Sequence, residues 1–314
     1  MLTDDLIADS PEAVGIASAK LEKLFDRIKQ EVDDGLLPAA QVALARDGKL
    51  AGMLSYGDCT DDKLFHFFSA SKAITSACGW LLIQDGNLDE NERVADIVPE
   101  FGTHGKDIIT VQQLFTHTCG FPRSQFPETD WWDKEARCRH FADWKLDWEV
   151  GSRFEYHPAT SMYLVAEIIE RRSGKEFQSF IRERIAKPLG LPELYVGCPR
   201  EQQHRAKDLI NVGERLSVDE YVALGFPPFP EEIMQILEDA IVGYNRAEYR
   251  DIPTPSGGAI TSAAEMALFY QIQAVVTTVI LRMVIGCRGL NLQFQALSTA
   301  YRALGEGEVM ELTF

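Results

Sequence analysis

The sequence FHFFSASKAITSACGWLL, residues 65–82, sets a serine and a lysine three positions apart, at Ser69 and Lys72. The pattern that follows Ser69 predicts a helix that runs to about Gln84 and stops at Asp85-Gly86. Side chains three positions apart share one face of a helix. We therefore expect the Lys72 amine to lie beside the Ser69 hydroxyl.

A serine beside a lysine is a nucleophile with a candidate base. The hydroxyl is a weak nucleophile until a neighbouring base takes its proton. Lysine can be that base only where burial lowers its pKa, because burial disfavours the ammonium form. The start of the helix adds a favourable field for an oxyanion at Ser69. A pattern with only two fixed positions also arises by chance, so its surroundings decide its weight.

Upstream of this stretch the sequence predicts a helix followed by a hairpin. Residues 18–34 space their apolar side chains along one helical face. The alternating segments QVALARD (41–47) and KLAGMLSYG (49–57) meet at Asp47-Gly48, a dipeptide typical of tight hairpin turns. A helix followed by a hairpin is the start of an α+β or α/β layer.

Downstream, residues 87–250 predict mostly short helices and loops, and residues 255–269 predict a tight turn at Gly257-Gly258 followed by a helix. Three pairs of residues have the spacing of a capping box, in which side chains bond the free amides of a helix's first turn. These pairs are Thr110 with Gln113, Ser217 with Glu220, and Ser262 with Glu265.

Four of the five tryptophans fall within residues 126–150, in an otherwise polar stretch: Trp131, Trp132, Trp144 and Trp148. Aromatic side chains gathered in a loop could line an apolar pocket for a substrate. They could equally pack a long loop onto the core. Both interpretations stay open, and the four residues are our candidates for substrate binding.

The chain is acidic, with 31 Lys and Arg against 48 Asp and Glu in 314 residues and a formal net charge of -17. Such a surface repels phosphate backbones and anionic headgroups, so neither nucleic acid nor a membrane is an expected partner. The first residues do not form a secretory signal, and the most apolar window, residues 274–285, is too short to span a bilayer. We therefore expect a cytoplasmic protein.

The six histidines and six cysteines do not have the spacing of metal ligands. No pair has HxH, HxxxH or CxxC spacing, so we set aside a metallohydrolase and expect no bound metal. Scattered cysteines are more typical of buried, reduced thiols.

Seven stretches, in order along residues 10–270, make the chain resemble the serine β-lactamase-like family of penicillin-binding proteins, class C β-lactamases and related carboxylesterases. They are SPEAVGIASAKLEKL (10–24), VALARDGKL (42–50), FFSASKAIT (67–75), LFTHTCGFP (114–122), FEYHPATSMYLVAEIIERRSG (154–174), RIAKPLGL (184–191) and PSGGAITSAAEMALF (255–269). In combination these stretches are much more specific than any one motif.

The resemblance implies an α/β (α+β) fold in which helices flank an antiparallel sheet and a mainly helical lobe is inserted. Residues 1–86 and 251–314 would form the α/β lobe of this single catalytic unit, and residues 87–250 the helical lobe. Ser69 would then lie in the cleft between the two lobes.

The resemblance also implies roles for three side chains. Ser69 would be the acylated nucleophile and Lys72 its base. Tyr156 matches the tyrosine of the family's second motif, which hydrogen-bonds the serine and relays protons to the leaving group. His157, the next residue, is expected to point away and takes no role.

The implied function is that of a serine hydrolase working through an acyl-enzyme. Its partner would be a small-molecule ester or amide substrate. The family's Tyr-x-Asn has Pro158 in its third place here, which favours small carboxylic esters, with β-lactam hydrolysis or acyl transfer as side activities. No cofactor is expected because this route uses only side chains. The sequence predicts no oligomeric state.

One family feature is missing. The third motif, Lys-Thr-Gly, His-x-Gly or Trp-x-Gly, has no counterpart, since no lysine follows Lys207, no histidine follows His204 and no tryptophan follows Trp148. The resemblance ends at about Gln271, and the last residues predict either a strand and a closing helix or a continuation of the helix opened at Ser262. We expect an incomplete sheet with exposed edges. The alternative function is therefore a non-catalytic or truncated relative that serves as a binding or assembly module.

Overall fold

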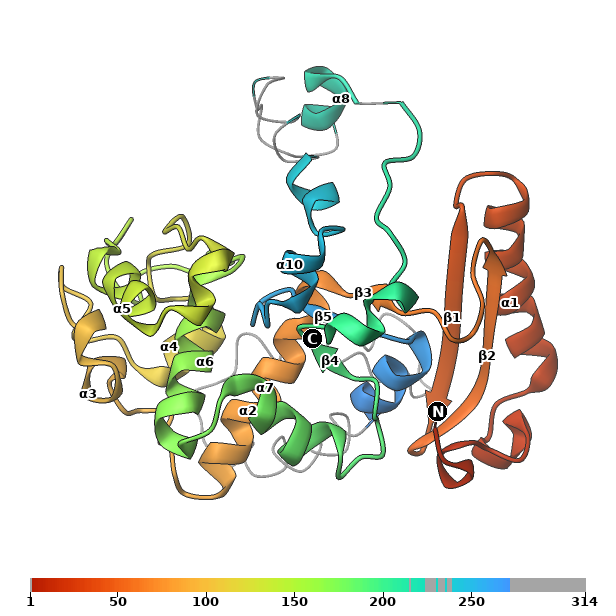
Figure 1. Cartoon of the computed structure of the whole chain (residues 1–314), viewed down its shortest axis with the longest axis horizontal. Helices are drawn as coiled ribbons and strands as arrows, with labels where there is room; N and C mark the ends of the chain where they lie inside the picture. The colour runs from red at the N-terminus through yellow and green to blue at the C-terminus, as the bar shows by residue number, and fades with distance from the viewer. Residues whose placement is uncertain (1, 215, 224–229, 231–234, 236–238, 272–314) are drawn as a thin grey trace.

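The computed structural model describes residues 2–271 apart from 215, 224–229, 231–234 and 236–238. The strand and helix considered for residues 272–314 therefore lie outside the described residues. Within them, a hairpin covered by one helix stands beside a larger helical body, and a small sheet lies between the two (Figure 1).

The hairpin unit consists of α1 (Ser18–Asp33), β1 (Ala39–Arg46) and β2 (Lys49–Gly57). The strands pair antiparallel, with Arg46 opposite Lys49 across the predicted turn. Asp47 and Gly48 take the positive φ angles, 53° and 76°, that a two-residue hairpin turn requires. Helix α1 packs on the hairpin so closely that a Cβ at Gly52 would lie 3.1 Å from the side chain of Leu21.

A second, three-stranded sheet joins distant parts of the chain. It consists of β3 (Phe65–His66), β5 (Ala259–Thr261) and β4 (Tyr195–Val196), in the order β3-β5-β4 with antiparallel neighbours. In the part of the chain that is described, the strands thus form two separate sheets. The pairing of β3 with β5 brings the segment that precedes Ser69 beside the segment that follows Gly257-Gly258.

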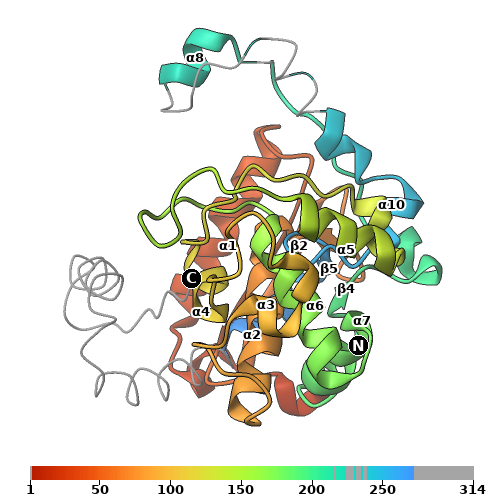
Figure 2. The ribbon, with the colours of Figure 1, turned by 90° about the vertical axis from the view of Figure 1, so that its left-hand side faces the viewer.

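Helix α2 (Ser71–Gln84) runs through the centre of the body against α6 (Thr160–Ser173) (Figure 2). Ile74, Cys78 and Leu82 lie one helical turn apart and are fully buried or nearly so. Helix α6 is buried over most of its length. This central pair fixes the start of α2, and Ser69 lies on the turn just before it.

Of the remaining helices, α3 (Val94–Ile97), α4 (Val111–Thr116) and α5 (Lys134–Asp143) lie at the left of Figure 1, and α7 (Phe177–Ile181) lies at its lower centre. Above the centre lie α10 (Ala247–Asp251) and, at the top, α8 (Val218–Ala223). Residues 263–271 are also helical. Short 3₁₀ helices occur at Asp4–Leu6, Pro11–Val14, Phe68–Ala70, Pro99–Phe101, Glu128–Trp132 and Arg200–Arg205, and a π-helical turn, Arg182–Ala186, follows α7. The division into lobes at residues 86 and 251 stays a prediction.

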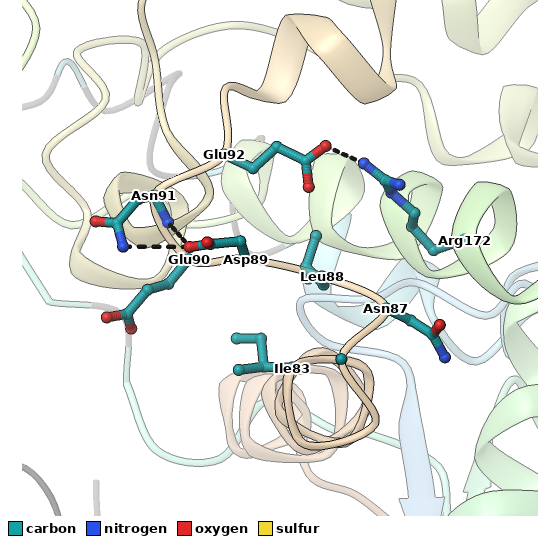
Figure 3. Close-up of a pocket in the computed structure, with 9 residues that line it drawn as sticks. Ile83, Asn87, Leu88, Asp89, Glu90, Asn91, Glu92 and Arg172 are labelled. Carbon is teal, nitrogen blue, oxygen red and sulfur yellow. Dashed lines mark hydrogen bonds and ion pairs between the residues drawn. The ribbon is translucent and has the colours of Figure 1, made fainter.

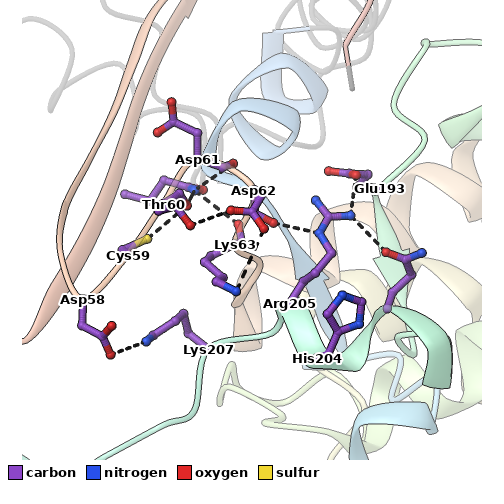
Figure 4. Close-up of polar contacts among 12 residues, drawn as sticks. Asp58, Cys59, Thr60, Asp61, Asp62, Lys63, Glu193, His204, Arg205 and Lys207 are labelled. Carbon is purple, nitrogen blue, oxygen red and sulfur yellow. Dashed lines mark hydrogen bonds and ion pairs between the residues drawn. The ribbon is translucent and has the colours of Figure 1, made fainter.

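A network of polar contacts fixes the loop between β2 and β3 (Figure 4). Lys207 Nζ donates to Asp58 Oδ2 over 2.7 Å, and Arg205 Nε donates to the Asp62 carbonyl over 2.8 Å. The other end of the Arg205 guanidinium donates to Glu193 Oε1 over 2.6 Å. These contacts anchor the entry to β3.

Two of the predicted capping boxes are confirmed. The Thr110 amide donates to Gln113 Oε1 over 3.0 Å at the start of α4. Ser217 and Glu220 exchange the equivalent bonds at the start of α8. The third box is only half formed. The Glu265 amide donates to Ser262 Oγ, but the Glu265 carboxylate accepts from the distant Glu193 amide instead.

Three further observations concern membrane spans, metal-binding groups and cysteines. No helix in the described ranges is long and apolar enough to cross a membrane. The same ranges contain no group of three His, Cys, Asp or Glu side chains able to hold a metal ion. Five cysteines fall within them, and each is a free thiol.

Candidate active site

Ser69 lies where the chain turns sharply from β3 into α2. The Phe67 amide donates to the Ala259 carbonyl over 2.9 Å, which ties this turn to β5. Phe68 has a φ of 41°, in the left-handed region that a bulky side chain rarely adopts. Such a conformation costs on the order of 1–3 kcal/mol and persists where its surroundings impose it. It places Ser69 on the 3₁₀ turn that opens α2.

Two hydrogen bonds meet at the Ser69 hydroxyl. Lys72 Nζ donates to Ser69 Oγ over 3.1 Å, and Tyr156 OH donates to the same atom over 2.9 Å. Lys72 Nζ also lies 5.0 Å from the centre of the Tyr156 ring. The three side chains predicted to act together are therefore in contact, although Tyr156 is 87 positions from Ser69 in the sequence.

Burial lowers the pKa of Lys72, and the neighbouring Tyr156 opposes that effect. The second partner of Lys72 Nζ is the carbonyl of Ser256, at 3.0 Å. A carbonyl orients the amine without adding a full negative charge that would favour the ammonium form. The surroundings of Lys72 thus meet the condition for a lysine base.

The loop that supplies the Ser256 carbonyl is bound to α2 at two further points. Thr75 Oγ1 donates to the Pro255 carbonyl over 2.6 Å, and the Ala259 amide donates to Ser71 Oγ over 2.8 Å. Gly258 permits this tight path, since a Cβ there would lie 2.8 Å from the Thr254 amide nitrogen. Residues 254–259 therefore set the position of the Lys72 amine.

Tyr156 lies on a segment, residues 153–158, without regular secondary structure, and the residue is 43% exposed. His157 is fully buried and points the other way, as predicted. Its Nε2 accepts from the Phe121 amide over 3.2 Å, and its Nδ1 lies 2.7 Å from the Glu155 carbonyl oxygen. His157 thus fixes the local backbone and leaves Tyr156 facing Ser69.

The four tryptophans occupy different environments. Trp131 and Trp144 are buried in the core, where Trp131 packs on Tyr163 and Trp144 on Phe121. Trp132 is 55% exposed. Trp148 lies nearest to the Tyr156 segment, with its ring 6.0 Å from His157.

The guanidinium of Arg153 lies 3.9 Å from the centre of the Trp148 ring. Packing of a loop onto the core, one of the two interpretations left open above, thus describes Trp131 and Trp144. A role in substrate binding stays a prediction for all four tryptophans.

Two residues at the site were not singled out from the sequence. The Ser256 carbonyl bonds Lys72, and the ring of His117 lies 5.0 Å from that of Tyr156. Both belong to stretches that carried the family resemblance, residues 114–122 and 255–269. Membership of these stretches was the one sequence feature that could have identified them, because nothing in their local spacing indicates contact with Lys72 or Tyr156.

A cavity of about 500 Å³ lies elsewhere, between the C-terminal end of α2 and the loop that follows it (Figure 3). Asp89, Glu90 and Glu92 line it. Asn91 bonds the Asp89 carboxylate, and Arg172 forms an ion pair with Glu92. This cavity does not contain Ser69, Lys72 or Tyr156.

Comparison with known proteins identifies the family. The sequence model named Beta-lactamase matches residues 24–305 of the chain, and thus most of its length. The chain belongs to the β-lactamase family. The match also runs past Gln271, where we expected the resemblance to end.

Three relatives illustrate the relationship. A β-lactamase of Yersinia enterocolitica is 27% identical over 175 residues, which cover 53% of this chain and 44% of the relative. A penicillin-binding protein homologue from Caulobacter crescentus has a TM-score of 0.63 and 28% identity, and the match covers 84% of this chain and 69% of that one. A family VIII carboxylesterase has a TM-score of 0.62 and 27% identity, over 77% and 66% of the two chains.

These matches confirm the predicted family and its mixed α/β fold. The aligned part spans about half the length of several of the curated relatives, 44% of one β-lactamase and 50% of another. The relatives include proteins named β-lactamase, D-alanyl-D-alanine carboxypeptidase and esterase. Membership of the family therefore leaves the substrate of this chain open.

Proposed function

We propose that this chain is a serine hydrolase that cleaves small carboxylic esters through an acyl-enzyme on Ser69. The observation that carries the proposal is the convergence of Lys72 Nζ and Tyr156 OH on one serine oxygen, at 3.1 and 2.9 Å. A nucleophile in contact with two proton-transfer groups is the arrangement that acyl transfer requires.

The first half of the reaction forms the acyl-enzyme. Ser69 Oγ attacks the ester carbonyl carbon while its proton passes to the neutral amine of Lys72. The backbone N–H of Ser69, at the start of α2, is one donor for the resulting oxyanion. Tyr156 OH then protonates the leaving alkoxide, the carbon–oxygen bond breaks, and the alcohol departs. Lys72 returns its proton to the tyrosinate.

The second half releases the acid. A water molecule gives a proton to the neutral Lys72 amine and attacks the acyl carbon. Collapse of the second tetrahedral intermediate breaks the bond to Ser69 Oγ, which regains a proton from the Lys72 ammonium. The products are one alcohol and one carboxylic acid, and the three side chains return to their starting states.

Ester substrates are favoured over lactams by Pro158. The family's asparagine at this place would supply a side-chain amide, which proline lacks. The similarity to a family VIII carboxylesterase supports the same choice. We propose that this chemistry uses no cofactor. We also propose a cytoplasmic location, as expected from the sequence. β-Lactam hydrolysis and acyl transfer to an alcohol would be side activities.

The substrate class is tested with a series of p-nitrophenyl esters, from acetate to octanoate, beside the chromogenic β-lactam nitrocefin. We expect a burst of p-nitrophenol followed by turnover, and a lower kcat/KM for nitrocefin. Ser69→Ala should abolish the burst, whereas Ser76→Ala, on the same helix, should retain it. A cooperatively folded wild type without burst or turnover would overturn the hydrolase proposal and favour the non-catalytic module.

A further inference from the structure

The segment that carries Tyr156 is held on both sides by one residue. The Glu155 amide donates to the His117 carbonyl over 3.2 Å. The His157 amide donates to Nδ1 of the His117 ring, also over 3.2 Å. Residues 153–158 have no strand or helix of their own to fix them. His117 therefore accepts one hydrogen bond from the residue before Tyr156 and one from the residue after it. We call this pair of hydrogen bonds the His117 bracket.

The ring of His117 also forms a surface against which Tyr156 lies. The two ring centres are 5.0 Å apart with an interplanar angle of 60°, which is an edge-to-face contact. The imidazole also stacks on the ring of His157, with the two ring centres 5.7 Å apart. Lateral movement of the phenol away from Ser69 would break these contacts.

The backbone of His117 is itself unusual. His117 ends α4 with a φ of 56° and a ψ of 36°, the left-handed conformation in which helices commonly end with glycine. A histidine there is less favourable than glycine or asparagine. Helix α4 is anchored by the buried side chains of Val111 and Leu114, so His117 projects from a fixed support.

We propose that His117 is a positioning residue that holds Tyr156 within hydrogen-bonding reach of Ser69. In this role the imidazole is neutral and carries its proton on Nε2, because Nδ1 accepts a hydrogen bond from the His157 amide. The catalytic consequence rests on the proposed hydrolase function, whereas the bracketing of Tyr156 does not.

The charge environment agrees with a neutral ring. Burial, together with the neighbouring His157 and Lys72, lowers the pKa of His117 to about 4. The ring is therefore neutral throughout the neutral pH range, and Nδ1 stays free to accept the hydrogen bond from the His157 amide.

Two substitutions separate the ring from the backbone. His117→Gly removes the Nδ1 acceptor without straining the left-handed backbone. His117→Asn tolerates the same backbone and returns an acceptor oxygen near the position of Nδ1. His104 offers a matched control, since it is exposed and has a φ of 54°. His104→Gly makes the same change in an equivalent conformation away from Tyr156.

Kinetics and amide exchange give independent results. A misplaced catalytic group commonly costs up to about 100-fold in rate, so His117→Gly should lower kcat for p-nitrophenyl ester hydrolysis by roughly 10- to 100-fold with KM within about twofold. His117→Asn should recover most of kcat, and His104→Gly should match the wild type. The His157 amide should exchange with deuterium faster in His117→Gly than in the other three proteins.

An unchanged kcat in His117→Gly would overturn the proposal. So would a low kcat in His117→Asn when exchange at His157 is back to the wild-type rate. If the wild type itself is inactive, the hydrolase proposal fails, and the bracket is judged by exchange alone. Faster His157 exchange in His117→Gly, reversed in His117→Asn, would then support it, and unchanged exchange would overturn it.

Discussion

At the scale of single residues, the properties of Lys72 decide what Ser69 can do. An exposed lysine is a cation at neutral pH and cannot take a proton. Here burial disfavours the ammonium form, and the partners of Nζ are the Ser69 hydroxyl and the Ser256 carbonyl. Tyr156 donates a hydrogen bond to Ser69 Oγ, and in the proposed mechanism it is the proton donor to the leaving group. The proposed roles of Lys72 as base and Tyr156 as acid can be tested separately by substitution.

The first prediction concerns Tyr156. Tyr156→Phe keeps the ring but removes the hydrogen bond to Ser69 and the proton for the leaving group. General acid–base catalysis typically contributes about 10²- to 10⁴-fold, so kcat should fall by that factor with little change in KM. Steady-state kinetics measures the effect, and the thermal unfolding midpoint should stay close to that of the wild type. A kcat within threefold of wild type would show that Tyr156 is not the acid.

The second prediction concerns pH. In the proposed mechanism the active form of Lys72 is the neutral amine, so activity should rise with pH through its pKa. Because burial lowers that pKa, the midpoint of kcat/KM should lie below the ordinary lysine value of about 10.4. Lys72→Arg should be inactive at every pH, since arginine stays protonated. An active arginine variant would contradict the role of Lys72 as base.

At the scale of elements, the loop of residues 254–258 holds the start of α2 in place through hydrogen bonds. It bonds α2 through Thr75 and Lys72, and the following Ala259 amide bonds Ser71. The tight turn predicted at Gly257-Gly258 lies inside this loop. The two glycines differ in the space around them, and this difference gives a matched test.

The third prediction compares these glycines. A Cβ at Gly258 would lie 2.8 Å from the Thr254 amide nitrogen, whereas a Cβ at Gly257 would meet nothing closer than 3.8 Å. Forcing extra atoms into a filled site typically costs about 1–3 kcal/mol. Gly258→Ala should lower the free energy of unfolding by that amount in a urea titration, and Gly257→Ala should change it little. Equal effects of the two substitutions would contradict the tight path of this loop.

Local signals allowed the elements to be predicted, and the family motifs allowed the three catalytic candidates to be predicted. The hairpin at Asp47-Gly48 and the capping box at Thr110 each depend on residues within a few positions. The bond from Lys72 to the Ser256 carbonyl spans 184 positions, and that from His157 to His117 spans 40. Such contacts leave no periodic pattern in the sequence, so neither was predicted.

At the scale of the whole molecule, Glu265 links the start of the helix at residues 263–271 to residue 193. This contact explains why the third capping box is half formed. The residue is 1% exposed, and its carboxyl group accepts from the Glu193 amide over 2.9 Å. Burial raises the pKa of Glu265 to about 8. The folded protein therefore keeps this group protonated at pH values where the unfolded chain ionises it.

The fourth prediction follows from this difference. The folded state binds one more proton than the unfolded state between the ordinary glutamate pKa and about 8, so Glu265 destabilises the fold as pH rises through that window. One pKa unit corresponds to about 1.4 kcal/mol and the pKa rises from 4.5 to about 8 on folding. Glu265→Gln should therefore raise the free energy of unfolding at pH 8 by roughly 4 kcal/mol and change it little at pH 4.5. Parallel stability curves for wild type and variant between these pH values would contradict the buried, protonated state.

The central claim, that Ser69 is an activated nucleophile in this chain, is tested most directly by intact mass spectrometry after incubation with a fluorophosphonate ester. The reagent's phosphorus forms a bond to the serine oxygen as fluoride leaves, so one modification adds one fixed mass. We predict a single adduct on the wild-type protein and none on Ser69→Ala. A folded wild-type protein that stays unmodified, or a Ser69→Ala variant that is modified equally, would contradict the claim.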